Sequence, residues 1–177
     1  MEYLTNINLS EELYTPPSYK IYCDMDGVLC DFEERFEHFS GISPEDYKNK
    51  HGDVKFWELI DQEVGSIFWE NMQWTERGRE LWNFIKKYTP NILTTPSYHK
   101  SSREGKQAWV QKNLSNYDKL LFTPREGKQA FADNNSILID DLGKNLRGWS
   151  SRGGIAIKCR YNNVDEVIQE LKDLGYR

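Results

Sequence analysis

Residues 24–29 read Asp-Met-Asp-Gly-Val-Leu and follow an apolar-leaning run, Tyr-Lys-Ile-Tyr-Cys, at residues 19–23. In an extended backbone, residues two apart lie on one side, so Asp24 and Asp26 point the same way. Gly27 permits a tight turn that exposes both carboxylates at the end of a strand. Two carboxylates held together repel unless a cation or a shared proton lies between them. The stretch therefore predicts a strand whose carboxyl end binds Mg²⁺ and a phosphate, with one Asp attacking and the other handling a proton.

The composition of the chain is that of a globular protein. Its 177 residues are 38% hydrophobic and 29% charged, enough for one domain with a core and a small inserted domain. The net charge of −5 argues against a broad basic face, and we expect no stable nucleic-acid partner. No apolar run approaches the ~20 residues that span a bilayer, and the N-terminal residues do not resemble a signal peptide. We therefore expect no membrane partner. The odd count of three cysteines makes a disulfide framework improbable and favours a cytoplasmic protein.

Short apolar segments alternate with helical patterns along the chain. Five segments read as strands, at residues 19–24, 91–94, 119–123, 136–140 and 154–157. Helices are expected from Phe32, from Pro44, over 76–88 with Thr75 as cap, over 101–113 with Ser101 or Ser102 as cap, and over 164–174. The alternation predicts an α/β fold, a Rossmann-like three-layer sandwich with a five-stranded, mostly parallel sheet.

Three of the expected strands end in residues that suit a phosphate site, namely Asp24, Thr94 and Asp140. Ligands of parallel sheets bind beyond the carboxyl ends of the strands. Asp140 and Asp141 end an apolar run, and a hard cation compensates carboxylates that enter a buried layer. Thr94 and Thr95 offer hydroxyl and N–H groups that suit phosphate oxygens. These strand ends therefore predict a single site at one edge of the sheet.

A six-residue segment, Arg-Glu-Gly-Lys-Gln-Ala, occurs twice, at residues 103–108 and 125–130. The repetition does not establish a duplication and is compatible with coincidence. Both copies follow expected strands, so Lys106 and Lys128 can face the same end of the sheet. A lysine at that position neutralises a phosphate and its transition state.

Four motifs in order resemble those of the haloacid dehalogenase-like hydrolases, a superfamily of Mg²⁺-dependent phosphatases. Residues 24–29 resemble the first motif, Thr94 the second, and residues 140–141 the fourth. Lys128 is the better candidate for the third motif. The likeness covers about residues 19–160, and the first and fourth motifs are its specific parts.

Within this superfamily the chain is most similar to the 5′(3′)-deoxyribonucleotidase branch. The residues that carry this likeness are DMDGVLCDFE at 24–33, LTTP at 93–96 and LIDD at 138–141. Lys106 resembles a second lysine of that branch that contacts the phosphate. Phe32 matches a position in its base pocket. The resemblance implies a nucleoside monophosphate as substrate.

The resemblance also implies a mechanism. Asp24 would attack phosphorus and form an aspartyl-phosphate, while Asp26 would protonate the leaving oxygen and then activate water. Mg²⁺ would be held by the Asp24 carboxylate, the Asp26 backbone carbonyl and Asp140, with Asp141 in support. Three side chains would hold the phosphoryl oxygens: Thr94, Thr95 and Lys128. An acid at Asp26 favours phosphate chemistry, because dehalogenases of the superfamily lack one there.

The superfamily sets specificity with an inserted cap, and the long interval between Asp24 and Thr94 has room for one. We expect a small helical cap at 33–88, a core domain at 19–32 and 89–177, and a lead-in at 1–18. Four of the six Trp fall in the cap interval: Trp57, Trp69, Trp74 and Trp82. Most of them should pack inside the cap, and one or two could stack on a base.

Several alternatives stay open at this point. The substrate could be another small phosphate ester or the 3′-phosphate end of a polynucleotide. A non-enzymatic alternative is a catalytically silent module that binds a phosphate or nucleotide, although Asp24, Asp26, Lys128 and Asp140 are all present. A homodimer is also left open.

Overall fold

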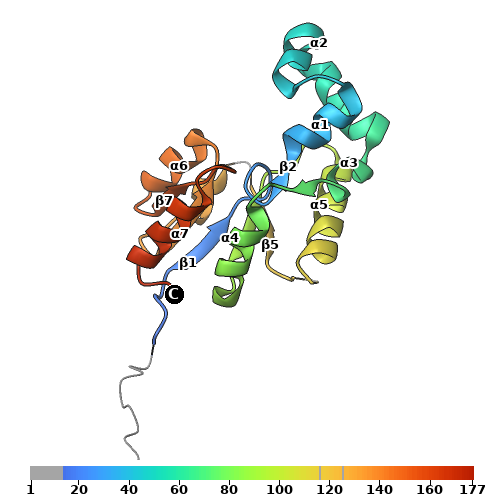
Figure 1. Cartoon of the computed structure of the whole chain (residues 1–177). Helices are drawn as coiled ribbons and strands as arrows, with labels where there is room; N and C mark the ends of the chain where they lie inside the picture. The colour runs from blue at the N-terminus through green and yellow to red at the C-terminus, as the bar shows by residue number, and fades with distance from the viewer. Residues whose placement is uncertain (1–13, 116, 125) are drawn as a thin grey trace, which may run out of the picture.

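The computed structural model describes residues 14–115, 117–124 and 126–177, so most of the expected lead-in lies outside the described residues. Its centre is a five-stranded sheet in the order β5-β4-β1-β6-β7, with every neighbouring pair parallel (Figure 1). The strands are β1 (Lys20–Cys23), β4 (Asn91–Thr94), β5 (Leu120–Phe122), β6 (Ser136–Asp140) and β7 (Ile155–Lys158). The five-stranded parallel sheet predicted from the sequence is therefore confirmed.

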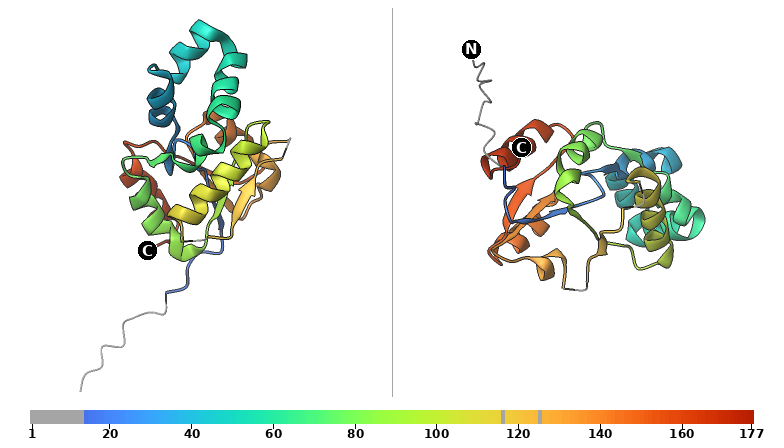
Figure 2. Two further views of the ribbon diagram at one scale, coloured as in Figure 1. Left: turned by 90° about the vertical axis from the view of Figure 1, so that its right-hand side faces the viewer. Right: turned by 90° about the horizontal axis from the view of Figure 1, so that it is seen from below.

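Alternate residues of the central strands enter two separate cores. Ile21 and Cys23 of β1 face the larger core, while Tyr22 faces a smaller one that contains Leu138 and Trp149. Helices that contribute to the larger core include α4 (Gly78–Ile85), α5 (Lys100–Asn113) and α7 (Val164–Asp173), and those of the smaller one are α6 (Gly143–Ser150) and the 3₁₀ turn η3 (Lys128–Phe131). Helices thus cover both sheet faces, which gives the three predicted layers (Figure 2).

A helical segment projects from the carboxyl end of the sheet (Figure 1). It consists of α1 (Phe32–Ser40), α2 (Pro44–Glu58), the π-helical turn η1 (Leu59–Val64) and α3 (Ser66–Glu70). The flanking strands β2 (Cys30–Asp31) and β3 (Gln73–Trp74) pair antiparallel and close its base. Both α1 and α2 begin where expected, with Asp31 and Ser43 as side-chain caps.

Helix α4 differs from its expected form in its start and its surroundings. Thr75 does not cap it, because the Thr75 hydroxyl donates to the Val28 carbonyl at 2.8 Å and the helix begins at Gly78. A 3₁₀ turn, η2 (Lys86–Tyr88), follows α4. The helix packs beside α7 in the layer on the sheet, and Arg77 pairs there with Asp165. The helix therefore lies with the sheet, although it falls within the interval 33–88 expected to form the cap.

The two copies of the repeated segment adopt different structures. The first lies within α5, which His99 caps by accepting from the Ser101 N–H, so the expected caps Ser101 and Ser102 are wrong. In the second, Gly127 has a φ of +88°, which the chain needs to turn before η3 begins. The described residues of the second copy, 126–130, thus form a turn and the start of a 3₁₀ helix, whereas their counterparts in the first copy lie within an α-helix, because tertiary contacts override local preference.

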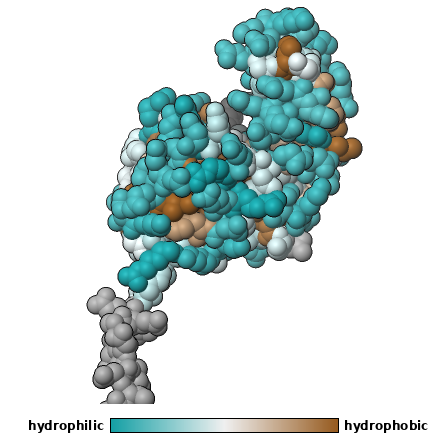
Figure 3. All heavy atoms as spheres, viewed as in Figure 1, coloured by the Kyte–Doolittle hydropathy of each residue, from teal (hydrophilic) through white to brown (hydrophobic). Residues whose placement is uncertain are grey.

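Most of the surface seen in Figure 3 is hydrophilic. Large hydrophobic side chains with high exposure include Val54 and Ile67 of the projecting segment. Among the described helices, none combines the length and apolar character needed to cross a membrane.

Candidate active site

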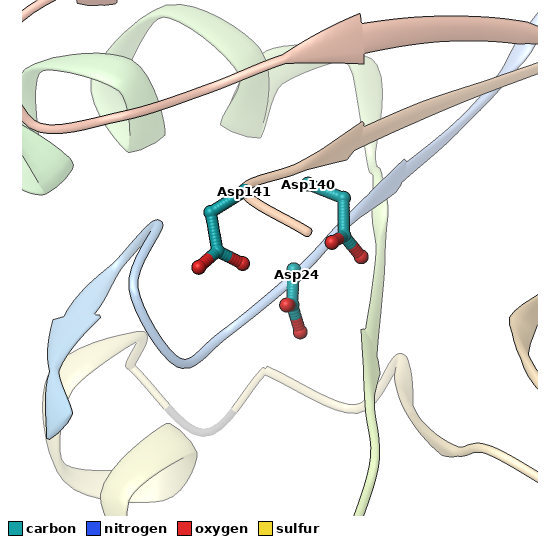
Figure 4. Close-up of side chains that lie close together, drawn as sticks. All are labelled: Asp24, Asp140 and Asp141. Carbon is teal, nitrogen blue, oxygen red and sulfur yellow. The ribbon is translucent and has the colours of Figure 1, made fainter. Parts of the chain in front are cut away.

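Three carboxylates gather at the carboxyl ends of the two central strands (Figure 4). Asp24 directly follows β1, while Asp140 ends β6 and Asp141 follows it. One oxygen from each lies within 4.8 Å of the others. The sheet register explains this convergence, because Cys23 lies opposite Ile139 and the Asp24 N–H donates to the Ile139 carbonyl at 2.8 Å.

The turn after Asp24 depends on Gly27. The Met25 N–H donates to Asp24 Oδ1 at 2.7 Å, which fixes the carboxylate against its own backbone. Gly27 has a φ of +76°, and a Cβ there would lie 2.7 Å from Asp141 Oδ2. A side chain at this position would therefore strain the turn and displace a carboxylate of the cluster.

Lys128 joins two of the carboxylates. Its Nζ lies 2.6 Å from Asp24 Oδ1 and 2.6 Å from Asp140 Oδ2, and the side chain is almost fully buried. Burial by itself lowers the pKa of Lys128, but the two carboxylates outweigh it and hold the pKa above its ordinary value. Lys128 therefore stays charged between Asp24 and Asp140.

Lys128 does not fully compensate the negative charge of the carboxylate cluster. Burial raises the pKa of Asp24 to about 7, and Asp140 and Asp26 add to the rise while Lys128 opposes it. Burial, with help from Asp140, raises the pKa of Asp141 to about 6. Among the described residues, Asp141 Oδ1 is buried and has no hydrogen-bond partner. An unpaired carboxylate oxygen in an all-oxygen cluster fits a hard cation such as Mg²⁺.

Asp140 is oriented by a residue that sequence reasoning missed. The Asn145 amide lies 3.1 Å from both Asp140 oxygens, and the Leu142 N–H donates to Oδ1 at 2.8 Å. Asn145 lies in the first turn of α6, directly after the strand end. Its place in the chain, an amide one turn beyond an acidic strand end, is the signal that could have identified it.

Asp26 lies in a second ion pair beside the first. Lys106 Nζ bonds Asp26 Oδ2 and also donates to Thr94 Oγ1 at 2.8 Å. The Lys106 side chain is completely buried, whereas Asp26 is partly exposed. Cys30 Sγ donates to the other oxygen of Asp26 at 3.6 Å. The structure thus brings Lys106, Thr94 and Asp26 together at the carboxyl end of the sheet.

Thr95 and Phe32 make their contacts with residues outside these ion pairs. The Thr95 hydroxyl donates to the Thr123 hydroxyl at 3.0 Å, and Thr123 in turn donates to the Thr94 carbonyl. Phe32 is partly buried and packs within an aromatic cluster. Its ring neighbours are Phe36, Phe56, Phe68 and Trp69, with centroids 5.3–6.4 Å away. The roles expected for Thr95 and Phe32 stay predictions.

A cavity of about 340 Å³ lies between the projecting segment and the loop after β4. Its walls include Trp57 and Asp61 on one side and Tyr98 on the other. The buried Asp61 accepts from Ser97 Oγ at 2.9 Å, which ties η1 to that loop. Trp57 is exposed, Trp74 is partly buried, and Trp69 and Trp82 are buried. Trp69 packs in α3 of the projecting segment, whereas Trp82 lies in α4 beside α7 and so does not pack inside the cap.

Comparison of the whole fold with solved structures finds several with a similar fold. No protein-family model matches the chain, and no curated protein sequence matches it. A HAD hydrolase of family IA, variant 3, from Entamoeba histolytica superposes with a TM-score of 0.52 at 14% identity, covering 88% of this chain and 98% of the other. A predicted phosphatase from Clostridium acetobutylicum gives 0.52 at 12% identity over 90% and 92% of the two chains.

A dehalogenase aligns equally well, with a TM-score of 0.54 at 12% identity over 90% of this chain and 97% of the other. Phosphatases and dehalogenases therefore share this fold, and the likeness does not choose between their reactions. The architecture of this chain is that of the haloacid dehalogenase-like hydrolases.

Proposed function

We propose that the protein is a Mg²⁺-dependent phosphomonoesterase that forms an aspartyl-phosphate on Asp24. The observation that carries the proposal is the pairing of two carboxylates with two lysines: Lys128 holds Asp24, and Lys106 holds Asp26. Asp24 is buried among charges, whereas Asp26 is partly exposed beside it. Unequal environments of this kind suit a nucleophile and an acid–base group.

Mg²⁺ bound by Asp24, Asp140, Asp141 and the Asp26 carbonyl would supply positive charge next to the phosphoryl oxygens. Both contacts that the structure gives the Asp24 carboxylate, from Met25 N–H and Lys128 Nζ, fall on Oδ1. We therefore assign the attack on phosphorus to Oδ2. Thr94, Thr95 and Lys128 would hold the oxygens of the transferring phosphoryl group.

The reaction then proceeds in two displacements at phosphorus. Asp24 Oδ2 forms a bond to phosphorus, the ester P–O bond breaks, and Asp26 gives its proton to the leaving alkoxide. Asp26 next takes a proton from water, whose oxygen attacks phosphorus. The bond to Asp24 breaks, and inorganic phosphate leaves with the carboxylate restored. A dehalogenase needs no proton on its leaving halide, so an acid at Asp26 favours a phosphate ester.

For the substrate we propose a nucleoside monophosphate. Support comes from Phe32 at the start of the projecting segment and from the cavity walls Trp57 and Tyr98, which offer flat apolar surfaces to a ring. The Asp61 carboxylate on the same wall can accept from a ring amine. Another small phosphate ester or a polynucleotide 3′-phosphate is the enzymatic alternative, and a silent binding module is the non-enzymatic one.

A panel of phosphate esters tests the reaction. We expect Mg²⁺-dependent phosphate release from dUMP or dTMP, lost on adding EDTA and reduced by about 10⁴-fold or more in Asp24→Asn. Asp173→Asn, on the exposed surface of α7, is the matched control and should retain activity. Turnover of sugar phosphates alone would leave the reaction standing and reject the nucleotide. No Mg²⁺-dependent turnover of any ester would reject the enzyme.

A further inference from the structure

The projecting segment rests directly on the helix that carries Lys106. At Gly105 of α5, a Cβ would lie 2.3 Å from the Ser66 carbonyl oxygen and 2.6 Å from Trp69 Cβ. Glycine is therefore required for α3 to approach this closely. The approach places the Trp69 side chain, itself buried, beside the next residue along α5.

That next residue is Lys106, and its ammonium group lies over the indole of Trp69. Nζ is 4.7 Å from the ring centroid, within the range of a cation–π interaction. An ammonium has three N–H donors, and two of them are engaged by Asp26 Oδ2 and Thr94 Oγ1. The ring supplies the remaining side of a completely buried charge.

Packing alone does not account for a tryptophan at this position. Among the described residues, Trp69 Nε1 is buried without a hydrogen-bond partner, and an unmet donor is unfavourable. An apolar residue without a polar group would avoid that penalty. Tryptophan, however, has the ring face that attracts cations most strongly. A second carboxylate would compete with Asp26 for the ammonium, whereas a neutral ring holds the ammonium without competing.

We propose that Trp69 is a positioning residue for the reaction: its ring face holds the Lys106 ammonium where it bonds Asp26, so that α3 sets the position of the acid–base carboxylate. The proposal rests on the proposed function. Lys106 takes Asp26 Oδ2, so Oδ1, which receives only a long contact from the weak donor Cys30 Sγ among the described residues, is the oxygen that carries the proton to the leaving group. Loss of the ring face frees the ammonium to shift and Asp26 to turn with it.

Leaving-group dependence tests this role. Protonation by Asp26 matters for an alkyl phosphate, whose alkoxide is a poor leaving group, and much less for p-nitrophenyl phosphate. In Trp69→Leu we expect kcat/KM to fall about tenfold or more for the alkyl ester and less than about threefold for the aryl ester, since general-acid catalysis contributes ~10²–10⁴-fold. Trp69→Phe keeps a ring and should recover part of the loss.

The matched control is Trp82→Leu, which removes a buried tryptophan of α4 that packs on Tyr117. It should leave the ratio of the two kcat/KM values unchanged. Equal losses for both esters in Trp69→Leu, or the same change of ratio in Trp82→Leu, would overturn the positioning role. A wild-type protein without Mg²⁺-dependent turnover would instead reject the proposed function.

A double-mutant cycle separates an effect through Lys106 from a general loss of packing. If Trp69 acts through Lys106, the double variant Trp69→Leu/Lys106→Met should lose no more alkyl-ester activity than Lys106→Met alone, within about twofold. Losses that multiply would mean that Trp69 acts independently of Lys106, and the inference would be wrong. Thermal melting of each variant, compared with Trp82→Leu, confirms that the proteins are folded at the assay temperature.

Discussion

Lys106 and Lys128 hold different carboxylates of one site: Lys106 pairs with Asp26, and Lys128 bridges Asp24 and Asp140. They occupy the same place in two identical six-residue segments. One is presented by the helix α5 and the other by the turn that opens η3. Because Asp24 and Asp26 are held by separate lysines, a substitution can disturb either carboxylate without removing the ion pair of the other.

Lys128→Met should impair both stability and activity. It removes the cation between Asp24 and Asp140, and breaking a buried ion pair lowers the free energy of unfolding by about 3–5 kcal/mol. We expect the loss in metal-free protein at pH 8, a smaller loss at pH 5 where the carboxylates take up protons, and partial recovery with Mg²⁺. Urea unfolding measures it. Lys158→Met, at the exposed end of β7, is the control, and an equal loss there would contradict the bridging role.

Gly27→Ala should be more damaging than Gly41→Ala. Both glycines have nearly the same φ, +76° and +75°, so alanine suffers the same backbone strain at either place. Only at Gly27 would the new Cβ also meet Asp141, whereas nothing lies within 4 Å of it at Gly41. We expect similar strain of about 1–2 kcal/mol in both variants, with weaker Mg²⁺ binding in Gly27→Ala alone. Calorimetric titration measures the Mg²⁺ affinity of both variants. Equal affinities would contradict this prediction.

Much of the site was predictable because its residues end strands. Apolar runs locate the strands, a parallel sheet brings their carboxyl ends together, and Asp24, Thr94 and Asp140 therefore converge. Contacts between distant segments left no such local signal. Thr75 resembles a helix cap, yet it bonds the Val28 carbonyl, and the placement of α4 beside α7 follows from packing. The contact of Trp69 with Lys106 likewise depends on two helices meeting in space.

Asp141→Asn should stabilise the metal-free protein in a pH-dependent way. The pKa of Asp141 rises from its ordinary 3.8 to about 6 in the fold, so the folded state disfavours the ionised carboxylate. That penalty is absent below about pH 4, grows as the pH rises toward 6, and is complete above it. The variant should therefore melt several degrees higher than wild type at pH 8 and at nearly the same temperature at pH 4.

Mg²⁺ should stabilise the wild-type protein more than the Asp141→Asn variant. The ion compensates the ionised Asp141, so saturating Mg²⁺ at pH 8 should raise the melting temperature of wild type more than that of the variant. Differential scanning calorimetry with and without the ion measures both effects. A stabilisation by Asp141→Asn that does not change between pH 4 and pH 8 would exclude the carboxylate charge as its cause.

Gly105→Ala should separate the projecting segment from α5. The new Cβ would meet the Ser66 carbonyl and the Trp69 Cβ, which are backbone-linked atoms that cannot rotate away, so α3 must shift. We expect a loss of about 1–3 kcal/mol in unfolding free energy and reduced activity. In Gly143→Ala of α6 the nearest atom is the flexible end of Arg147, so helix propensity should instead leave that variant unchanged or stabilise it by up to ~1 kcal/mol. Chemical denaturation compares the two variants. Equal stabilities would show that α3 does not depend on the contact at Gly105.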